Sequence, residues 1–429
     1  MSRQEQVMLH SYETLNYHRQ KSRLGELADR CRVNTGTPII TQQALLLMNI
    51  EIYGHVAPGF DKVKDAFAAN WQGIEVGACL SVVHQGETII DLWAGFQDQA
   101  CTKAWQRDTL VNVYSTTKGL SSIAIAHLAD RGLLDYEARM IDYWPEFGAQ
   151  GKDTLTVAQV LSHLGGLCGV SEPLSVSDLY NWQKMTQLLA AQKPLWELGD
   201  EAGYHAVTWG YLPGELFLRI TGKSMGQYFH EHIAGPLNAD CFIGLPSSEL
   251  HRVAELVGPN RARIQPPATD STPSAPPLYA AAMLNPSIRP YKDASSNEWR
   301  MAEIAAANGQ ANARGIALVY GMMANGGKMA GVNFISTDGI ATACQLEKED
   351  GIDLVTGVPM RRARGFMLGV DGAYGPNEKA FGHAGAGGSL GFADPENNIA
   401  FGYAMNQMQA DPNATPRSRL LVDALYQCL

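Results

Sequence analysis

We predict an α+β fold for this 429-residue chain: a central antiparallel sheet flanked by terminal helices, with a mostly helical domain inserted in the middle. Three observations support this prediction. Segments with strand-like composition lie near both ends of the chain, segments with helical spacing fill its centre, and the first two strand-like runs are joined by a short polar connection that contains a glycine. Strands from both termini therefore belong to one sheet, and the helical part is an insertion between them.

The first part of the sheet domain is expected at residues 48–114. Apolar side chains recur three and four positions apart over residues 59–71, which predicts a helix. Two strands are expected at 77–83 and 88–95, and residues 84–87 form the polar connection between them. This pattern predicts a hairpin of adjacent antiparallel strands.

The inserted helical domain is expected at residues 115–299. Helical spacing recurs over 156–164, 178–192 and 208–221. Residues 258–295 are rich in proline, serine and alanine, which indicates a long irregular loop. Loops of this length in compact enzymes often form lids or pocket walls, so we expect this one to line a pocket.

The second part of the sheet domain is expected at residues 300–429, where the strand-like segments return after one helix. Helices are expected at 311–325 and 416–427, and strands at 365–370, 380–383, 388–393 and 399–406.

Residues 1–47 differ from the rest of the chain because they are polar, mixed and without clear periodicity. A second methionine that could start the chain stands at Met48. We expect residues 1–47 to be an N-terminal extension that is disordered or artefactual, and the alternative is a helical arm that packs elsewhere. Charges occur throughout residues 1–30, so we expect no secretory signal peptide.

The composition restricts the classes of partner. The formal net charge of −10 argues against nucleic acid or an anionic membrane surface. No apolar run approaches the length of a membrane span. Seven cysteines, an odd number without a C-x-x-C pair, favour free thiols in a reducing cytoplasm. We therefore expect a cytoplasmic protein that acts on a small molecule, with its oligomeric state left open.

The run from Ser115 to Lys118 reads Ser-Thr-Thr-Lys and is the most informative motif. An apolar-alternating stretch leads into Ser115, and a helical pattern follows it as far as Gly132. Positions three apart at a helix start share one face, so the lysine amine can reach the serine hydroxyl and take its proton. The alternative for a serine at this place is a helix cap.

With this S-x-x-K motif, the sequence resembles the serine β-lactamase and penicillin-binding-protein superfamily, and more narrowly the family VIII carboxylesterases and class C β-lactamases. The resemblance covers about residues 55–425. Supporting runs occur in the expected order at Asp108–Leu110, Leu161–Leu167, Gly235–Leu237, Asn308–Ala317 and Gly382–Gly385. The resemblance implies a β-lactamase/transpeptidase-like fold and hydrolysis through a serine acyl-enzyme.

The resemblance also assigns catalytic roles. Ser115 is the expected nucleophile, and Lys118 and Tyr204 together deprotonate it. The base is left open between the two, with a Tyr204 phenolate held by Lys118 favoured. Tyr204 matches the first position of the family's Y-x-N triplet, but Ala206 stands where amidases carry an asparagine that holds the substrate amide. The alternative for Tyr204 is a core tyrosine with a structural hydrogen bond.

The family's K-T-G element matches His383-Ala384-Gly385, so a histidine replaces the lysine. Gly385 would let this strand approach the substrate closely. The resemblance places the oxyanion hole at the backbone N–H groups of Ser115 and Ala386. His383 is expected to donate to the substrate or to tune Tyr204, and its alternative is a structural hydrogen bond.

Two competing motifs are set aside. Gly387–Gly391 matches the G-x-S-x-G nucleophile elbow around Ser389, but that elbow needs a following helix, and the following residues are strand-like. The run His230–His232 contains two histidines that would point to different sides of a helix, so we expect no metal site there. No cofactor is expected.

The sequence therefore predicts a serine carboxylesterase that hydrolyses short-chain carboxylic esters, with weak β-lactam hydrolysis. A class C-like β-lactamase and an acyltransferase are the enzymatic alternatives, because acyl-enzyme chemistry is common to all three. A penicillin-binding-type binding protein is the non-enzymatic alternative. Retention of both Ser115 and Lys118 argues against it.

Overall fold

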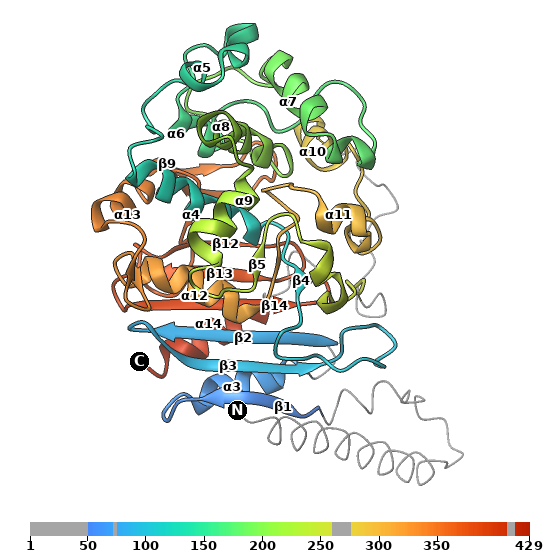
Figure 1. Cartoon of the computed structure of the whole chain (residues 1–429), viewed down its shortest axis with the longest axis vertical. Helices are drawn as coiled ribbons and strands as arrows, with labels where there is room; N and C mark the ends of the chain where they lie inside the picture. The colour runs from blue at the N-terminus through green and yellow to red at the C-terminus, as the bar shows by residue number, and fades with distance from the viewer. Residues whose placement is uncertain (1–49, 72–74, 260–275, 410–416) are drawn as a thin grey trace.

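The computed structural model describes residues 50–71, 75–259, 276–409 and 417–429. Figure 1 shows strands β1, β2 and β3 at one end of the molecule and helices α5, α7 and α8 at the other. The predicted extension at 1–47 and residues 260–275 of the predicted pocket loop at 258–295 lie outside the described residues.

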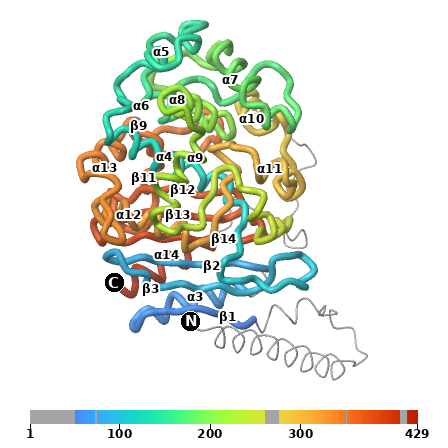
Figure 2. Tube along the Cα trace, in the orientation of Figure 1, coloured from blue at the N-terminus to red at the C-terminus, as the bar shows by residue number. Residues whose placement is uncertain are grey.

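The main sheet has nine antiparallel strands in the order β1-β3-β2-β14-β13-β12-β11-β10-β9. The central pair joins the two halves of the chain, because β2 pairs with β14 (Figure 2). The predicted α+β class, with one sheet built from both termini, is confirmed. The strands are β1 Ile52–Val56, β2 Gly77–His84, β3 Glu87–Gly95, β9 Leu346–Ile352, β10 Pro359–Ala363, β11 Met367–Leu368, β12 Phe381–Ala384, β13 Leu390–Asp394 and β14 Ile399–Met405.

Strand β14 illustrates how the sheet separates two apolar layers. Its larger side chains, including Phe401 and Tyr403, belong to the cluster that packs under α3 (Asp61–Ala69) and α14 (Arg417–Tyr426). Its small residues face α12 (Ala313–Ala324) on the other side. A Cβ on the β14 glycine, Gly402, would lie 2.2 Å from the Ala313 carbonyl oxygen, so helix and strand are in backbone contact there. The period-2 alternation of a strand thus sets both layers.

The middle of the chain is mostly helical, with two short ladders. The helices are α4 Thr116–Asp130, α5 Met140–Tyr143, α6 Val157–Leu161, α7 Trp182–Ala191, α8 Tyr211–Thr221, α9 Met225–Phe229, α10 Pro277–Met283 and α11 Asn297–Met301, and α13 Thr337–Ala343 follows α12. One ladder has the order β4-β6-β5, and the other pairs β7 with β8. Their strands are β4 Val111–Asn112, β5 Cys241–Phe242, β6 Gln310–Ala311, β7 Lys328–Met329 and β8 Val332–Asn333. In the described part of the chain, no helix is both long and apolar enough to cross a membrane.

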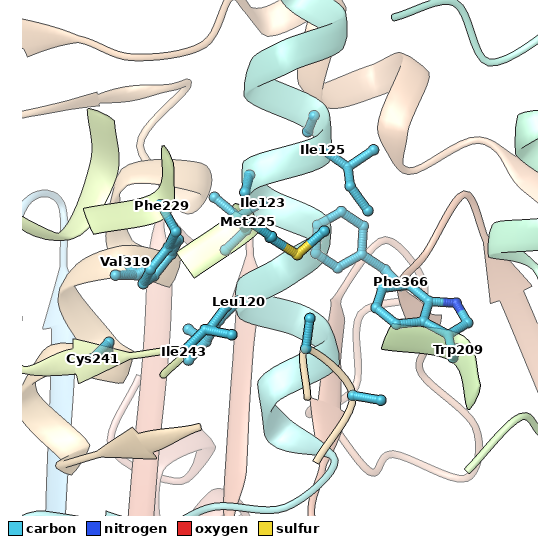
Figure 3. Packing of buried hydrophobic residues seen from close by; sticks show 14 of the residues in the cluster. Leu120, Ile123, Ile125, Trp209, Met225, Phe229, Cys241, Ile243, Val319 and Phe366 are labelled. Carbon is cyan, nitrogen blue, oxygen red and sulfur yellow. The ribbon is translucent and has the colours of Figure 1, made fainter. Parts of the chain in front are cut away.

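Helix α4 lies in the middle of the core. Every residue from Thr116 to Leu128 is buried, which is the pattern of a helix that is packed on all sides. Figure 3 shows Leu120, Ile123 and Ile125 among apolar side chains from several other segments. Two buried serines on α4 donate to backbone carbonyls, Ser121 to Ala305 (2.7 Å) and Ser122 to Gly365 (2.7 Å). The N-terminus of α4 is therefore held firmly in place.

Some elements differ from the sequence prediction. The strands β9 and β10 were not predicted, and the predicted strand at 365–370 is only the two-residue β11. The predicted helix at 156–164 ends at Leu161, because His163 takes a left-handed φ of 67° and cannot continue the helix. The boundaries of the two domains remain a prediction.

Candidate active site

Ser115 lies at a sharp turn between β4 and α4. Tyr114, just before it, has a φ of 44°, a left-handed conformation that is uncommon for a residue with a side chain. The turn leaves Ser115 partly exposed while Thr116 and Val113 on either side are buried. The chain thus presents one hydroxyl at the beginning of a buried helix, as the S-x-x-K prediction requires.

Lys118 lies one turn into α4 and is completely buried. Its Nζ is 3.4 Å from the Ser115 Oγ and donates to two backbone carbonyls, Ala206 O (2.7 Å) and Ala306 O (3.0 Å). Burial lowers the pKa of Lys118 well below its ordinary value. Two positions on Nζ are taken up by these carbonyls, and a third faces the Ser115 Oγ.

Tyr204 lies beside this pair and is 8% exposed. The Lys118 Nζ sits 4.7 Å from the centre of the Tyr204 ring. Burial raises the pKa of the Tyr204 phenol, and a hydrogen bond with Ser115 opposes part of that rise. The hydroxyl of Ser115 is therefore within reach of both groups, with Tyr204 in its neutral form.

Two histidines support the segment that carries Tyr204. The His205 backbone N–H donates to His163 Nδ1 (3.0 Å), and the His163 ring lies 5.0 Å from the Tyr204 ring. The His205 ring is buried, accepts from the Leu167 N–H (2.9 Å) and bonds the Gly203 carbonyl (2.6 Å). Burial lowers the pKa of His205 to about 3, so it is a neutral structural group. Neither histidine was predicted from the sequence to have a role.

His383 is on β12, and its ring lies 6.1 Å from the Tyr204 ring. Its Nδ1–H donates to the Ala384 carbonyl (2.7 Å), which leaves the lone pair on Nε2. This Nε2 is buried and has no hydrogen-bond partner among the described residues. Burial lowers the pKa of His383 to about 3. The imidazole is neutral at pH 7 and offers an acceptor to the site, whereas a donor was one of the two expected roles.

The turn after β12 brings Gly385 against the nucleophile segment. A Cβ at Gly385 would lie 2.1 Å from the Val113 carbonyl oxygen, so only glycine fits this approach. Within the described residues, neither the Ser115 N–H nor the Ala386 N–H donates to a backbone acceptor. Both donors that the resemblance assigned to the oxyanion hole are thus unoccupied by the protein itself.

An apolar cluster includes Tyr204. It contains Cys168, Ala282 and Val355, and Leu278 and Met283 from the predicted pocket wall pack against it. The side chain of Ala206 also packs here. The polar asparagine of the amidase triplet is therefore replaced by a methyl group on an apolar surface.

The competing serine has a different environment. Ser389 is 1% exposed and is followed directly by strand β13, with no helix. The nucleophile-elbow geometry is absent at this residue. For the run His230–His232, no group of three metal-ligating side chains is found in the described parts of the chain.

Comparison with known proteins decides the family. The family model described as beta-lactamase matches residues 63–426. The chain belongs to the β-lactamase family. This match covers the sheet and the site together, so the S-x-x-K motif stands in its expected fold.

Relatives narrow the assignment. Over 83% of both chains, the sequence is 36% identical to an "Esterase/beta-lactamase LipL" of Mycobacterium tuberculosis. The crystal structure of a family VIII carboxylesterase is 48% identical, with a TM-score of 0.83, and covers 88% of this chain and 100% of its own. A penicillin-binding protein homolog from Caulobacter crescentus is 38% identical, with a TM-score of 0.80 and the same coverage. These similarities make the chain a serine hydrolase of the β-lactamase and penicillin-binding-protein superfamily.

Proposed function

We propose that this protein is a carboxylesterase that hydrolyses short-chain esters through an acyl-enzyme on Ser115. The observation that carries the proposal is the desolvated Lys118 amine, which is fixed by two carbonyls 3.4 Å from the Ser115 Oγ. A lysine whose pKa is lowered by burial can remove the serine proton without a metal or a histidine base.

The proposed reaction has two symmetrical halves. Lys118 takes the Ser115 proton, Ser115 attacks the ester carbonyl, and the N–H groups of Ser115 and Ala386 stabilise the oxyanion. The proton reaches the leaving alcohol through Tyr204, whose hydroxyl bonds Ser115 and whose ring lies 4.7 Å from the Lys118 Nζ. Water then attacks the acyl-enzyme by the same path in reverse. The opposite pKa directions of Lys118 and Tyr204 favour Lys118 as the base, instead of the Tyr204 phenolate favoured from the sequence.

The substrate preference follows from the surface around Tyr204. Leu278, Met283 and Val355 form an apolar wall suited to a short acyl or alkyl group. His383 is neutral and offers an acceptor, so it cannot pair with the carboxylate of a β-lactam as a lysine would. Ala206 has no side-chain amide with which to hold the amide of a β-lactam. All three features favour esters over β-lactams.

Weak β-lactam hydrolysis is the second candidate activity, because the relative from Mycobacterium tuberculosis is named both an esterase and a β-lactamase. Acyl transfer to an alcohol is the third: it would use the same acyl-enzyme with an alcohol in place of water. A penicillin-binding role without turnover is the fourth. It would leave a stable acyl group on Ser115, and mass spectrometry of the intact protein would detect that group.

The test is a panel of p-nitrophenyl esters of increasing acyl length measured beside a chromogenic cephalosporin. We expect the highest kcat/KM for short acyl chains and at least tenfold less for the cephalosporin. A fluorophosphonate probe should add one mass increment to the wild type and none to Ser115→Ala. Ser81→Ala is the matched control. It removes a buried hydroxyl on β2 that donates to the Ile90 carbonyl on β3 (2.9 Å). Ester turnover retained by Ser115→Ala would disprove the proposal.

A cytoplasmic location remains a prediction. It is supported by the free thiols of Cys79, Cys168 and Cys241, which are buried, and those of Cys344 and Cys428, which are partly exposed. Such thiols are typical of proteins kept in a reducing compartment.

A further inference from the structure

The turn that carries Ala386 contains three glycines and does not fix its own position. Its ends are closed by hydrogen bonds from Gly388 N to Gly385 O (3.1 Å) and from Gly385 N to Ser389 O (2.8 Å). Gly387 has a φ of 90°, as the third residue of a type II turn requires. The turn leaves the Ala386 N–H available. Glycine restricts the backbone conformation very little. Contacts outside the turn must therefore hold this N–H in place.

Ser389 provides that contact on the side of the nucleophile. Its hydroxyl donates to the Val113 carbonyl (2.8 Å). The Thr116 hydroxyl lies 3.0 Å from the Ser389 Oγ. Because the Ser389 proton is used on Val113, Thr116 is the donor in the second bond. Val113 and Thr116 stand on either side of Ser115. One buried hydroxyl therefore joins the two backbone segments that carry the two N–H groups of the oxyanion hole.

Arg417 holds the turn from the opposite side. This residue is 1% exposed, and its guanidinium donates to Gly387 O (2.8 Å) and to the buried Glu75 carboxylate (2.7 Å). It anchors the turn to α14 and to the segment before β2. These bonds tie the turn to Glu75 and α14, whereas the Ser389 hydroxyl ties it to the segment that carries Ser115.

We propose that Ser389 is a positioning residue for ester hydrolysis, which sets the separation of the Ser115 and Ala386 N–H groups. The inference rests on the proposed function, since it requires the acyl-transfer mechanism. Donors of an oxyanion hole act at 2.7–3.1 Å from the developing oxyanion, so a shift of a few tenths of an ångström weakens their transition-state stabilisation. Ser389 touches neither the substrate nor the reacting atoms.

The test combines kinetics with a transition-state mimic. Loss of a whole oxyanion donor costs about 10²–10³ in kcat, so we expect Ser389→Ala, which only displaces one, to lose about tenfold. KM for p-nitrophenyl butyrate should change by less than about twofold, because the hole binds the transition state and not the ground state. A trifluoromethyl ketone, whose Ser115 adduct carries an oxyanion, should bind about tenfold more weakly to Ser389→Ala.

Two variants separate positioning from simple stability. Ser389→Thr keeps the hydroxyl and should recover both kcat and ketone affinity relative to Ser389→Ala. Ser81→Ala loses an equivalent buried hydrogen bond and should lower only Tm. If Ser389→Ala does not fold, Thr116→Val, which removes the donor to Ser389 with little change of shape, should lower kcat and ketone affinity together.

The outcomes distinguish this inference from the proposed function. Wild-type kcat and ketone affinity in a folded Ser389→Ala, or in Thr116→Val if the former does not fold, would overturn the inference alone, provided that Ser115→Ala is inactive. A loss confined to Tm or to KM would do the same. Turnover retained by Ser115→Ala would overturn the proposed function, and the positioning role would fail with it.

Discussion

The start of α4 and the start of β13 each present a serine in a hydrolase-like motif, in contrasting surroundings. Ser115 is partly exposed, has as neighbour the Lys118 amine, whose pKa burial lowers, and precedes a buried helix. Ser389 is buried, donates a hydrogen bond to a backbone carbonyl and precedes a strand. A carbonyl oxygen is too weak a base to activate a hydroxyl, so of these two serines we propose Ser115 as the nucleophile.

The difference shows that a motif specifies chemistry only together with the element that follows it. In S-x-x-K the helix itself brings the base to the nucleophile, because residues i and i+3 share a face. In G-x-S-x-G the base comes from elsewhere in the chain, and the motif supplies only a turn. The same turn residues can therefore serve at Ser389 to hold a neighbouring segment.

The strongest way to break the comparison is to remove each hydroxyl in turn. Ser115→Ala should lose about 10⁴-fold or more of kcat, because no other nucleophile replaces it. Ester turnover and fluorophosphonate labelling measure this loss. Labelling should persist in Ser389→Ala. If the two variants behaved in the opposite way, Ser389 would be the nucleophile and the comparison would be inverted.

The base at Ser115 is the next point to sharpen. Lys118→Ala and Tyr204→Phe should each lower kcat by about 10²–10⁴, the range for positioned acid–base groups. The double variant should be little worse than the worse single one, because both groups act on one proton path. Losses that multiply in the double variant would show that the two groups serve separate steps.

The pH profile tests which group is the base. Burial lowers the pKa of Lys118 well below its ordinary value, and only its neutral form accepts the proton. As pH falls through that lowered pKa, kcat/KM should therefore fall about tenfold per pH unit. The pKa of His383 is lowered to about 3, so His383→Gln should change the height of the profile and leave its acidic limb in place between pH 5 and 9. An acidic limb that disappears in His383→Gln would assign the titration to the histidine.

The smallest expected effect concerns substrate choice. Ala206→Asn restores an amide next to the site, so it should raise the rate of acylation by a cephalosporin relative to a short ester by several-fold, on the order of one good hydrogen bond. Ala206→Leu, which adds apolar volume alone, is the control. If the wild type already hydrolyses the cephalosporin as well as its best ester, the amide is held by other groups and the substrate argument fails.

Much of the fold could be predicted because its central elements are continuous runs of apolar and small residues. Helices α4 and α12 and strands β2 and β14 are nearly all apolar or small, and their patterns are clear in the sequence. Strand β9 carries the charged run Glu347–Glu349 and lies at the sheet edge, so neither alternation nor burial marks it. Strands of two residues, such as β4, are too short for any period.

The candidate site was predictable where side-chain chemistry is local, as for Ser115 and Lys118. The two carbonyls that fix the Lys118 amine come from Ala206 and Ala306, 88 and 188 residues away. Every residue has a backbone carbonyl, so no sequence pattern identifies those two. The role of His163 was missed for a related reason, since it depends on a backbone N–H of His205 that the fold brings to it.

The pairing of β2 with β14 has a consequence for how the protein is made. These strands are neighbours inside the sheet but more than 300 residues apart in the chain. Non-local strand pairing folds slowly because a long loop must close first. On the ribosome, β2 can pair with β3 early, but it stays without β14 until the more than 300 residues between these two strands have been made. The pairing that joins the two parts of the sheet therefore forms only after the whole helical region between them has been synthesised.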